Sequence, residues 1–336
     1  MLETPTGPTP DGLSSFERLL VLKKLPTYGT LPSADLAVLA DLSRERFFPK
    51  GSLLLAEGEA VPAIYLIVEG RVEISRGGRV IGTVAADNGI GGLGLLAGDP
   101  FAIDARALVD TVTLELEADL LFELFEDRFA ILHHILRDLS RQMIDEYRDP
   151  RMSPAEIIPL GEGVPAGRDL DLVERIFFLR KVIPFRKAGI NALAELSRAL
   201  TQVQLEAGTV LWREGEAAHS VFLVMSGRVR CRSAAGQDFL AAPGFPLGAL
   251  EAVAESPRWY EASAETRLAG LQGPVETLVD VFEDNFDLSR LYLGGLARGL
   301  IRILERRLVL GDDLPSFGLS PAVEVVVSPG PEAPSA

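Results

Sequence analysis

An internal repeat constrains the fold of this chain more than any other feature of its sequence. The segment FPKGSLLLAEGEAVPAIYLIVEGRVEI at residues 48–74 aligns without a gap to LEAGTVLWREGEAAHSVFLVMSGRVRC at residues 205–231. The spacing is 157 residues, which is the difference between positions 51 and 208, and both the E-G-E and the G-R-V motifs keep it. Further along the chain, the same spacing relates Gly91 to Gly248. A gapless repeat of this kind predicts two copies of one structural unit.

Pro- and Gly-rich segments flank the two copies and predict where the domains end. The resulting organisation is a disordered N-terminus at 1–14, a first domain at 15–148, a linker at 149–171, a second domain at 172–310 and a Pro-rich acidic tail at 311–336. The tail lacks Lys and Arg, so we expect it to be largely disordered. Its run 322–327 has strand character, however, and could add to a sheet edge of a partner or of its own domain.

Short apolar runs rich in branched residues follow one another in the first copy, separated by turns, which is typical of antiparallel strands. These runs are residues 52–55, 64–68, 71–75, 79–84 and 111–116. Apolar residues at three-to-four spacing predict helices at 34–47 and 120–147, and the second copy is followed by another helix at 287–308. We therefore expect a mainly β fold with flanking α-helices: two tandem β-roll domains (double-stranded β-helix, jelly-roll-like), each with N-terminal and C-terminal helices.

The stretch NGIGGLGLLAGDPFAIDARA at 88–107 contains Gly89, Gly91 and Gly94 in the G-x-G-x-x-G spacing of a dinucleotide-binding turn. That turn leads into a long helix whose N-terminal amides hold the pyrophosphate. Here only three residues follow Gly94 before the helix-breaking GDP at 98–100. We therefore do not expect these glycines to bind a dinucleotide.

The charge of the chain limits its partners. Its formal net charge is −15 and its sequence pI about 4.8, whereas binding to DNA, RNA or an anionic membrane needs a surplus of Lys and Arg. We expect no nucleic-acid and no membrane partner, although a local basic patch could still exist. The sequence shows no signal peptide and no membrane-spanning apolar run, and its single cysteine, Cys231, fits a reducing compartment. We therefore expect a cytoplasmic protein.

Motifs for catalysis or metal binding are missing from the sequence. It contains no G-x-S-x-G elbow, no H-E-x-x-H and no P-loop lysine motif. The adjacent His133 and His134 would point about 100° apart on a helix, so they do not form the i, i+4 pair that chelates a metal. Two rolls and their linkers also use up the chain and leave no room for a catalytic output domain. We expect a protein that is not an enzyme and has no metal site.

The repeated residues resemble a known family, the cyclic nucleotide-binding domains of catabolite-activator-type regulators and of regulatory subunits of cAMP-dependent protein kinase. The resemblance rests on the pattern G-x-L-L-x-x-E-G-E, on the E-G-R-V or S-G-R-V that follows, and on a short Gly-to-Pro cassette. It covers residues 15–148 and 172–308, so both copies are similar to members of the family. The opening glycines of the 88–107 stretch then belong to a phosphate-binding cassette.

In this family the cassette reads approximately F-G-E-L-A-L-L-x-x-x-P-R-x-A-T. The resemblance implies that helix N-terminal amides and the arginine neutralise the cyclic phosphate, while the glutamate accepts a hydrogen bond from the ribose 2′-hydroxyl. In the first copy Gly91 matches the glycine, but Gly92 replaces the glutamate, Phe101 the arginine and Asp104 the threonine. Losing the arginine contacts costs roughly 1.5 to 3 kcal/mol, and a carboxylate about 5 Å from the phosphate roughly 3 more. We do not expect the first domain to bind cAMP or cGMP.

The second copy keeps more of the cassette. Gly248 and Arg258 match the glycine and the arginine, whereas the glutamate is replaced. The candidate ligand-binding residues are Gly248, Ala249, Leu250, Arg258 and Trp259.

Two of these candidate residues also have a structural interpretation. Arg258 could be a surface arginine that pairs with Glu255 or Glu261. Trp259, like Phe101 in the first copy, could fill an emptied pocket with apolar bulk.

Three functions follow from the sequence and the resemblance. We favour a non-enzymatic regulatory or scaffold protein whose degenerate domains act through unknown protein partners. The alternative is a sensor that binds cAMP or cGMP through Arg258 of the second domain, and these nucleotides are the only cofactors expected. A catabolite-activator-type transcription regulator is less favoured, because an acidic Pro-rich tail stands where a basic helix-turn-helix is needed.

The long helices at 120–147 and 287–308 predict how two copies of the chain could associate. Such helices often mediate dimers in proteins that this chain resembles, so we also expect a homodimer. The alternative is that the apolar face of the second helix only covers its own roll.

Overall fold

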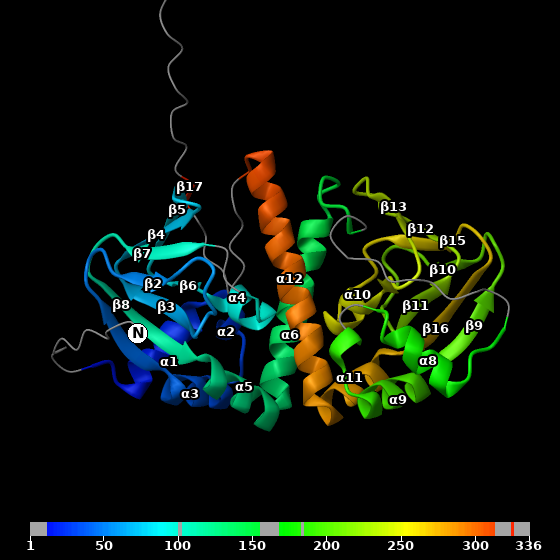
Figure 1. Cartoon of the computed structure of the whole chain (residues 1–336), viewed down its shortest axis with the longest axis horizontal. Coiled ribbons are helices and arrows are strands. Elements are labelled where there is room, and N and C mark those ends of the chain that lie inside the picture. The colour runs from blue at the N-terminus through cyan, green and yellow to red at the C-terminus, as the bar shows by residue number, and fades with distance from the viewer. Residues whose placement is uncertain (1–11, 100–102, 155–167, 183–184, 313–323, 326–336) are drawn as a thin grey trace, which may run out of the picture. The chain divides into compact units, whose positions relative to one another are not determined.

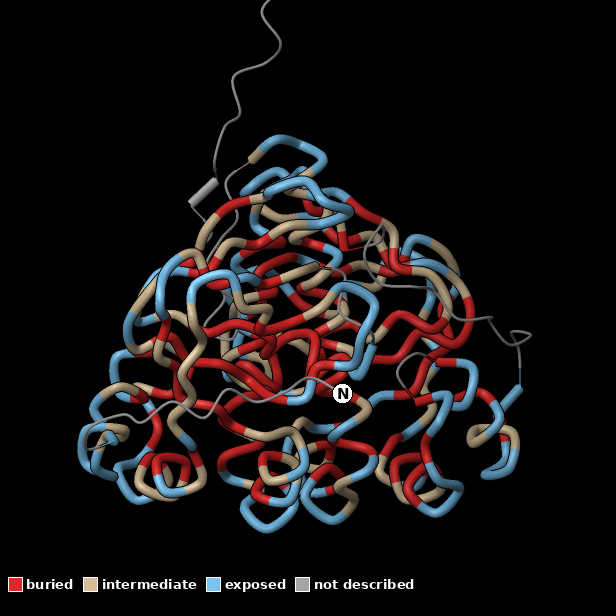
Figure 2. The backbone as a smooth tube through the Cα atoms, turned by 60° about the vertical axis from the view of Figure 1, so that its left-hand side comes forward, coloured by how far each residue is buried: buried red, intermediate tan, exposed pale blue. Residues whose placement is uncertain are grey.

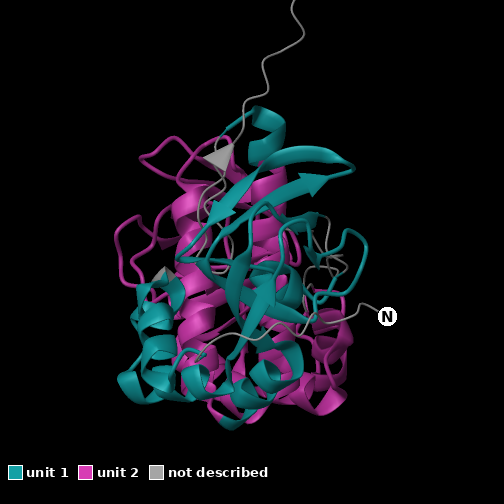
Figure 3. Cartoon of the chain, turned by 90° about the vertical axis from the view of Figure 1, so that its left-hand side faces the viewer, with its two compact units in different colours: residues 1–127, 307–336 teal, residues 128–306 magenta. Residues whose placement is uncertain are grey.

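The structure consists of two compact units. It is a computed structural model that describes residues 12–99, 103–154, 168–182, 185–312 and 324–325. One unit comprises residues 1–127 together with 307–336, and the other comprises residues 128–306 (Figure 3).

The first unit contains two antiparallel sheets and several helices (Figure 1). One sheet has the strand order β1-β8-β3-β6 and the other the order β17-β5-β4-β7-β2. The strands are β1 (Arg44–Phe48), β2 (Leu53–Leu55), β3 (Ala63–Glu69), β4 (Arg71–Arg76), β5 (Arg79–Ala85), β6 (Asn88–Ile90), β7 (Asp104–Ala107), β8 (Thr111–Glu117) and β17 (Glu324–Val325). The helices are α1 (Ser15–Lys24), α2 (Pro26–Gly29), α3 (Ser33–Leu42), α4 (Gly92–Ala97) and α5 (Ala118–Asp127).

The second unit repeats this plan with sheets of strand order β10-β15-β12-β13 and β14-β11-β16-β9. The strands are β9 (Thr201–Leu205), β10 (Val210–Trp212), β11 (Ser220–Ser226), β12 (Val229–Arg232), β13 (Asp238–Ala241), β14 (Pro246–Leu247), β15 (Glu261–Ala264) and β16 (Leu268–Pro274). The helices are α6 (Phe129–Tyr147), α8 (Leu172–Leu179), the 3-10 helix η1 (Phe185–Lys187), α9 (Ile190–Ala199), α10 (Ala249–Val253), α11 (Val275–Asp284) and α12 (Phe286–Leu310). The last turn of α12, from residue 307 on, is assigned to the first unit. The expected fold of two tandem β-rolls with flanking helices is confirmed.

The spacing of 157 residues also relates helices of the two units, pairing α3 with α9 and α5 with α11 from their first to their last residue. It pairs the start of α1 with the start of α8, and each of these helices begins with a capping box. In α1 the box is made by Ser14 and Glu17, and in α8 by Asp171 and Glu174. Each box satisfies two backbone amides that the first turn of a helix leaves unpaired.

Local geometry explains the repeated G-R-V motif. Gly227 has a φ of +87°, and a Cβ atom there would lie 2.3 Å from the carbonyl oxygen of Arg267, so only glycine fits. The valine that follows, Val229, is fully buried and alternates with more exposed neighbours along β12, as period-two strands require. Figure 2 shows where buried, intermediate and exposed residues lie along the backbone.

Two expected helices differ in the structure. The helix expected at 34–47 ends at Leu42, and residues 44–48 form the edge strand β1 instead, paired in antiparallel register with β8. The helix expected at 120–147 is two helices, because Arg128 has non-helical backbone angles (φ −134°, ψ 77°). Of the two, α5 belongs to the first unit and α6 to the second.

The tail contributes a short strand to its own unit. Glu324 and Val325 form β17, which pairs with β5, so the strand expected in the run 322–327 is confirmed for these two residues. The disorder expected elsewhere concerns residues 1–11, 313–323 and 326–336, which lie outside the described residues, as does most of the expected linker. None of the helices that are described has the length and apolar composition needed to cross a bilayer.

The apolar face of α12, expected as a dimer contact, is buried inside the second unit. Leu293, Leu296 and Leu300 are at most 4% exposed. A Cβ atom on Gly299 would lie 2.7 Å from the terminal methyl carbon of Met143 on α6. These leucines are therefore interior residues of the chain, as the alternative expects, and the homodimer stays a prediction.

Candidate functional site

The first cassette keeps its glycine and lacks a polar side chain after it. Gly91 precedes α4 with a φ of +90°, and a Cβ atom there would come within 2.9 Å of the carbonyl oxygen of Ala63. Gly92, the first residue of α4, stands where the family has its glutamate, so this position offers no side-chain oxygen to a ribose hydroxyl. All six residues of α4 are buried. Phe101, at the arginine position, lies outside the described residues.

Asp104 of the first cassette is held by a neighbouring turn. Its Oδ1 accepts a hydrogen bond of 2.8 Å from the backbone N–H of Glu57, in the E-G-E turn. The residue itself begins β7, opposite Ser75 on β4. The carboxylate thus has a structural partner, and it places a negative charge where the family has its threonine.

The E-G-E motif has a structural role that the sequence did not reveal. The Oε2 atom of Glu57 accepts a hydrogen bond of 2.7 Å from the backbone N–H of Gly77, in the turn between β4 and β5. At the equivalent position, Glu214 accepts a bond of 2.7 Å from the N–H of Ala234. The only sequence signal for this role is that the glutamate and its spacing to the hairpin occur in both copies.

The second cassette is closed by its own side chains. Gly248 precedes α10 with a φ of +73°, and a Cβ atom there would overlap Arg258, 2.1 Å from its Nη1. The backbone N–H of Gly248 donates to the hydroxyl of Tyr260 at 3.1 Å. Ala249 is buried and Leu250 is partly buried on the short helix that follows. The cassette glycine is therefore in contact with protein groups through its amide, its carbonyl and its Cα side.

Arg258 is an interior arginine. It is 3% exposed, its Nη1 donates to the carbonyl of Gly248 at 3.1 Å, and its Nη2 donates to the carbonyl of Ser220 at 2.5 Å. Its Cζ lies 4.1 Å from the centroid of the Trp212 ring, which is a cation–π contact. The alternative of a surface arginine is wrong, because Arg258 is buried; Glu255 instead pairs with Arg137 at 3.3 Å.

Trp259 lies in a cluster of aromatic rings. It is 6% exposed and stacks at 6.1 Å, centroid to centroid, on Phe239 and also on Tyr147 of α6. Its ring meets that of Tyr260 edge-on at 4.8 Å. Trp259 is thus packed as an interior residue in contact with three other aromatic rings.

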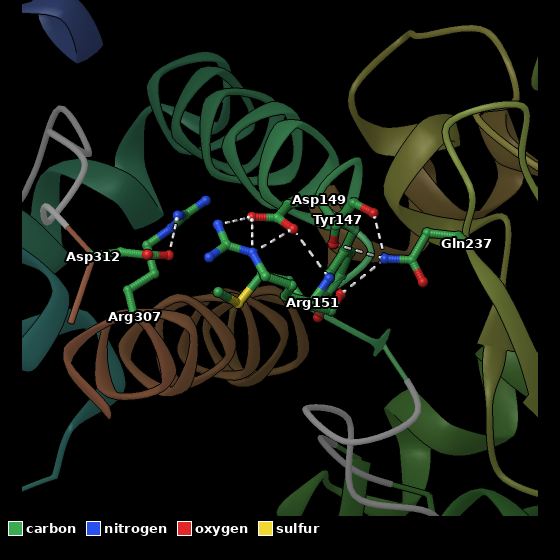
Figure 4. Close-up of polar contacts among 7 residues, drawn as sticks. Tyr147, Asp149, Arg151, Gln237, Arg307 and Asp312 are labelled. Atoms are coloured by element: carbon green, nitrogen blue, oxygen red, sulfur yellow. Dashed lines mark hydrogen bonds and ion pairs between the residues drawn. The ribbon is translucent and has the colours of Figure 1, made fainter. Parts of the chain in front are cut away.

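A single side chain fixes the end of α6 beside this cluster. Gln237, in the turn between β12 and β13, is 4% exposed, and its Nε2 donates to the carbonyls of Tyr147, Asp149 and Met152 at 2.8, 2.9 and 3.3 Å (Figure 4). Tyr147 and Met152 are completely buried. The sequence did not predict this contact, because Gln237 and α6 are separated by 90 residues along the chain.

A buried acid changes the electrostatics of the second cassette. Glu251 of α10 is 1% exposed, and burial raises its pKa to about 7, although its own backbone N–H and the charge of Arg258 oppose this rise. Its Oε1 has no hydrogen-bond partner among the described residues. When ionised, Glu251 would compete with an added anion for the field of Arg258.

The family model that matches this chain agrees with this architecture. A family model described as cyclic nucleotide-binding domain matches residues 45–128 and 202–285, together half of the chain. Among solved structures, the cAMP-bound PfPKA-R is 15% identical, with a TM-score of 0.34, and the match covers 93% of this chain and 96% of that chain. The regulatory subunit of a cAMP-independent protein kinase A from Trypanosoma brucei is 16% identical, with a TM-score of 0.32 and coverage of 83% and 92%.

Curated relatives match a shorter part of the chain. An uncharacterized NTE family protein of Mycobacterium tuberculosis is 28% identical over 123 residues, which are 36% of this chain and 21% of that protein. The chain thus spans about a fifth of the length of the curated relatives it matches. The family model, in contrast, matches both rolls. The chain therefore belongs to the cyclic nucleotide-binding domain family, with two tandem copies of the domain.

Proposed function

We propose that this chain is a non-enzymatic regulatory protein whose two domains act through a protein partner and do not bind cAMP or cGMP. The main support for this proposal is that the guanidinium of Arg258 is buried and already bound to protein groups. Both terminal nitrogens of its guanidinium already donate to backbone carbonyls, and its face lies on Trp212. A cyclic phosphate could bind there only by breaking these contacts, and each hydrogen bond made by the charged guanidinium contributes about 1.5–3 kcal/mol.

Other groups of the second cassette support the same proposal. The Gly248 amide is used by Tyr260, and the Trp259 ring is covered by Phe239 and Tyr147. The methyl side chain of Ala249 cannot accept a hydrogen bond from a ribose hydroxyl. The first domain has neither the arginine nor the glutamate of the family at its matching positions. Neither domain therefore presents the set of groups that the family uses for a cyclic nucleotide.

The experiment is thermal unfolding of the full chain with and without millimolar cAMP or cGMP. A ligand at one hundred times its Kd would stabilise the native state by about 2.7 kcal/mol, and we expect no change in Tm. A rise in Tm that is lost in Arg258→Gln but kept in Arg232→Gln, whose arginine is 64% exposed, would overturn the proposal.

The alternative, a nucleotide sensor in the second domain, is favoured by one observation. The Nε of Arg258 and the indole nitrogens of Trp212 and Trp259 are buried without a hydrogen-bond partner among the described residues. Unpaired buried donors are costly, and an anion could satisfy them if the aromatic cluster opened. The rise in Tm described above, with its dependence on Arg258, is the result that this alternative predicts.

A further inference from the structure

Helix α1 carries an exposed stripe that contributes nothing to the core of its unit. Phe16 is 68% and Leu20 43% exposed, and Lys23 and Lys24 are exposed as well. At 100° per residue, positions i, i+4, i+7 and i+8 fall within about 100° of one another on a helix. The four residues therefore form one face, with two large apolar side chains followed by two bases.

Helix α8 of the second unit carries the same stripe. Val173 is 58% and Phe177 65% exposed, and they stand at the positions of Phe16 and Leu20, 157 residues further along. The bases are repeated too, because exposed Arg180 and Lys181 match Lys23 and Lys24. Arg180 keeps helical backbone angles (φ −63°, ψ −21°), so the face continues past the last residue of α8. We call the two stripes the α1 face and the α8 face.

The inner sides of the two helices match for reasons that the fold explains. Leu22 and Leu179, which are equivalent, are both completely buried. Arg18 donates from Nη1 to the carbonyl of Ser43 at 2.7 Å, and the equivalent Arg175 donates to the carbonyl of Leu200 at 3.2 Å. The fold does not require apolar side chains at positions that face solvent. An exposed apolar pair at equivalent positions of both copies therefore indicates a binding role.

We propose that the α1 face and the α8 face each bind an acidic amphipathic helix of a partner protein. The apolar pair of each face, spaced i, i+4, matches the anchor spacing of helix recognition. Charge identifies the partner. Each face ends in two basic residues, although the net charge of the chain is −15. Glutamates or aspartates of the partner would therefore face positive charge at these two sites. This inference deepens the proposed function by naming the chemistry of the partner.

The ion pair that Lys24 forms on the α1 face would yield to such a partner. Lys24 pairs with Asp87 at 3.1 Å, but the two side chains are 60% and 50% exposed. Pairs this exposed contribute little to stability, so Lys24 can exchange Asp87 for a carboxylate of the partner at small cost. Two similar stripes on one chain also allow a partner with two such helices to bind by avidity.

The test uses the full chain and a fluorescently labelled synthetic peptide of about five helical turns, with leucines on one face and glutamates elsewhere. Fluorescence anisotropy should show saturable binding at two sites per chain. Two control peptides keep the length: one has the same composition with its leucines spread around the helix, and one has lysine in place of glutamate. Neither control should bind with comparable affinity.

Paired variants assign the sites. The double variant Phe16→Ser with Leu20→Ser should abolish binding at the α1 face, and Val173→Ser with Phe177→Ser should abolish it at the α8 face. The fourfold variant should lose both sites. We expect the affinity of each altered site to fall by at least about tenfold. Because the altered side chains are exposed, Tm should stay unchanged. Val109→Ser and Val210→Ser are the matched controls, since these residues are 46% and 41% exposed but lie off both faces.

Three outcomes would overturn the inference. The first is no binding of the acidic peptide, or binding that the paired variants leave unchanged. The second is a dimer mass in light scattering that the fourfold variant reduces to a monomer, which would assign the faces to a second copy of this chain. The third is co-sedimentation with phosphatidylserine vesicles that depends on the same residues. A failure of the peptide to bind would not change the outcome of the Tm measurement with cAMP or cGMP. The inference and the proposed function can therefore be judged separately.

Discussion

At the scale of single residues, Glu251 makes the stability of the second domain depend on pH. Burial raises its pKa from 4.5 to about 7, so the folded protein holds a proton there that the unfolded chain has already released. Between these two values the folded state binds more protons than the unfolded state, and the free energy of unfolding therefore falls as pH rises. Below about pH 4.5 the carboxyl is neutral in both states and this loss disappears.

We expect Glu251→Gln to be less sensitive to pH than the wild-type protein. The difference between a pKa of about 7 and one of 4.5 corresponds to roughly 3 kcal/mol, so the variant should gain stability relative to wild type as pH rises from about 4.5 to 8. Urea unfolding at several pH values measures this difference. Glu255→Gln, at an exposed acid, is the control, and parallel pH curves for Glu251→Gln and wild type would contradict the prediction.

Arg258 is a structural residue at the same scale, because its fork joins two segments of the second roll. Arg258→Lys keeps the charge but cannot reach the carbonyls of Gly248 and Ser220 with the geometry of a guanidinium. We expect a loss of about 2–3 kcal/mol in the free energy of unfolding. Arg232→Lys should change it by less than about 0.5 kcal/mol, and an equal effect of the two variants would show that Arg258 has no special structural role.

At the scale of secondary-structure elements, the end of α6 is tied to the β12–β13 turn by one amide. We expect Gln237→Leu to destabilise the protein by about 1–3 kcal/mol, because the buried carbonyls of Tyr147 and Met152 and the partly buried carbonyl of Asp149 each lose a donor. Faster hydrogen exchange in residues 143–152 and a change in tryptophan fluorescence, since Trp259 stacks on Tyr147, should accompany the loss. Gln204→Leu, at an exposed glutamine, should change neither signal. Unchanged exchange in Gln237→Leu would mean that stacking alone holds the helix end.

The sequence predicts elements well where periodicity decides them and poorly where a distant partner does. The strands β3, β4, β5 and β8 lie within one residue of their expected ends. In contrast, the residues of β1 continue the apolar spacing of α3, and only pairing with β8 makes them a strand. The break at Arg128 is hidden in the same way, because apolar periodicity continues on both sides of it.

Within the candidate site, the sequence predicted which positions differ from the family but not how their neighbours respond. It identified Arg258 and Trp259 as candidates and Asp104 as an intruding acid. Asp104 contacts Glu57, which lies 47 residues away along the chain. Arg258 contacts the ring of Trp212, which is about as distant in sequence. A local sequence pattern does not predict contacts between segments this far apart. Glu251 and Gln237 were not singled out, since a lone Glu or Gln carries no signal until its burial is known.

At the scale of the whole molecule, the repeat and the compact units divide the chain differently around α6. The helix follows the first roll in sequence but belongs to the second unit, where Met143 and Tyr147 are buried. We propose that residues 128–306 form an independently folding unit. A fragment of these residues should unfold cooperatively in urea, whereas a fragment of 149–306 should be less stable by several kcal/mol, because it lacks the buried face of α6. Equal stability of the two fragments would contradict this division.

The duplicated turn bonds of Glu57 and Glu214 have a consequence for comparing the two copies. Two copies in one chain act as an alignment of the protein with itself, and they agree where the fold needs a residue, as in these glutamates and in the glycines Gly91 and Gly248. They disagree where a nucleotide would touch them, with Gly92 facing Ala249 and Phe101 facing Arg258 across the alignment. The two copies therefore share the residues that the architecture needs and differ at the positions that match the nucleotide contacts of the family.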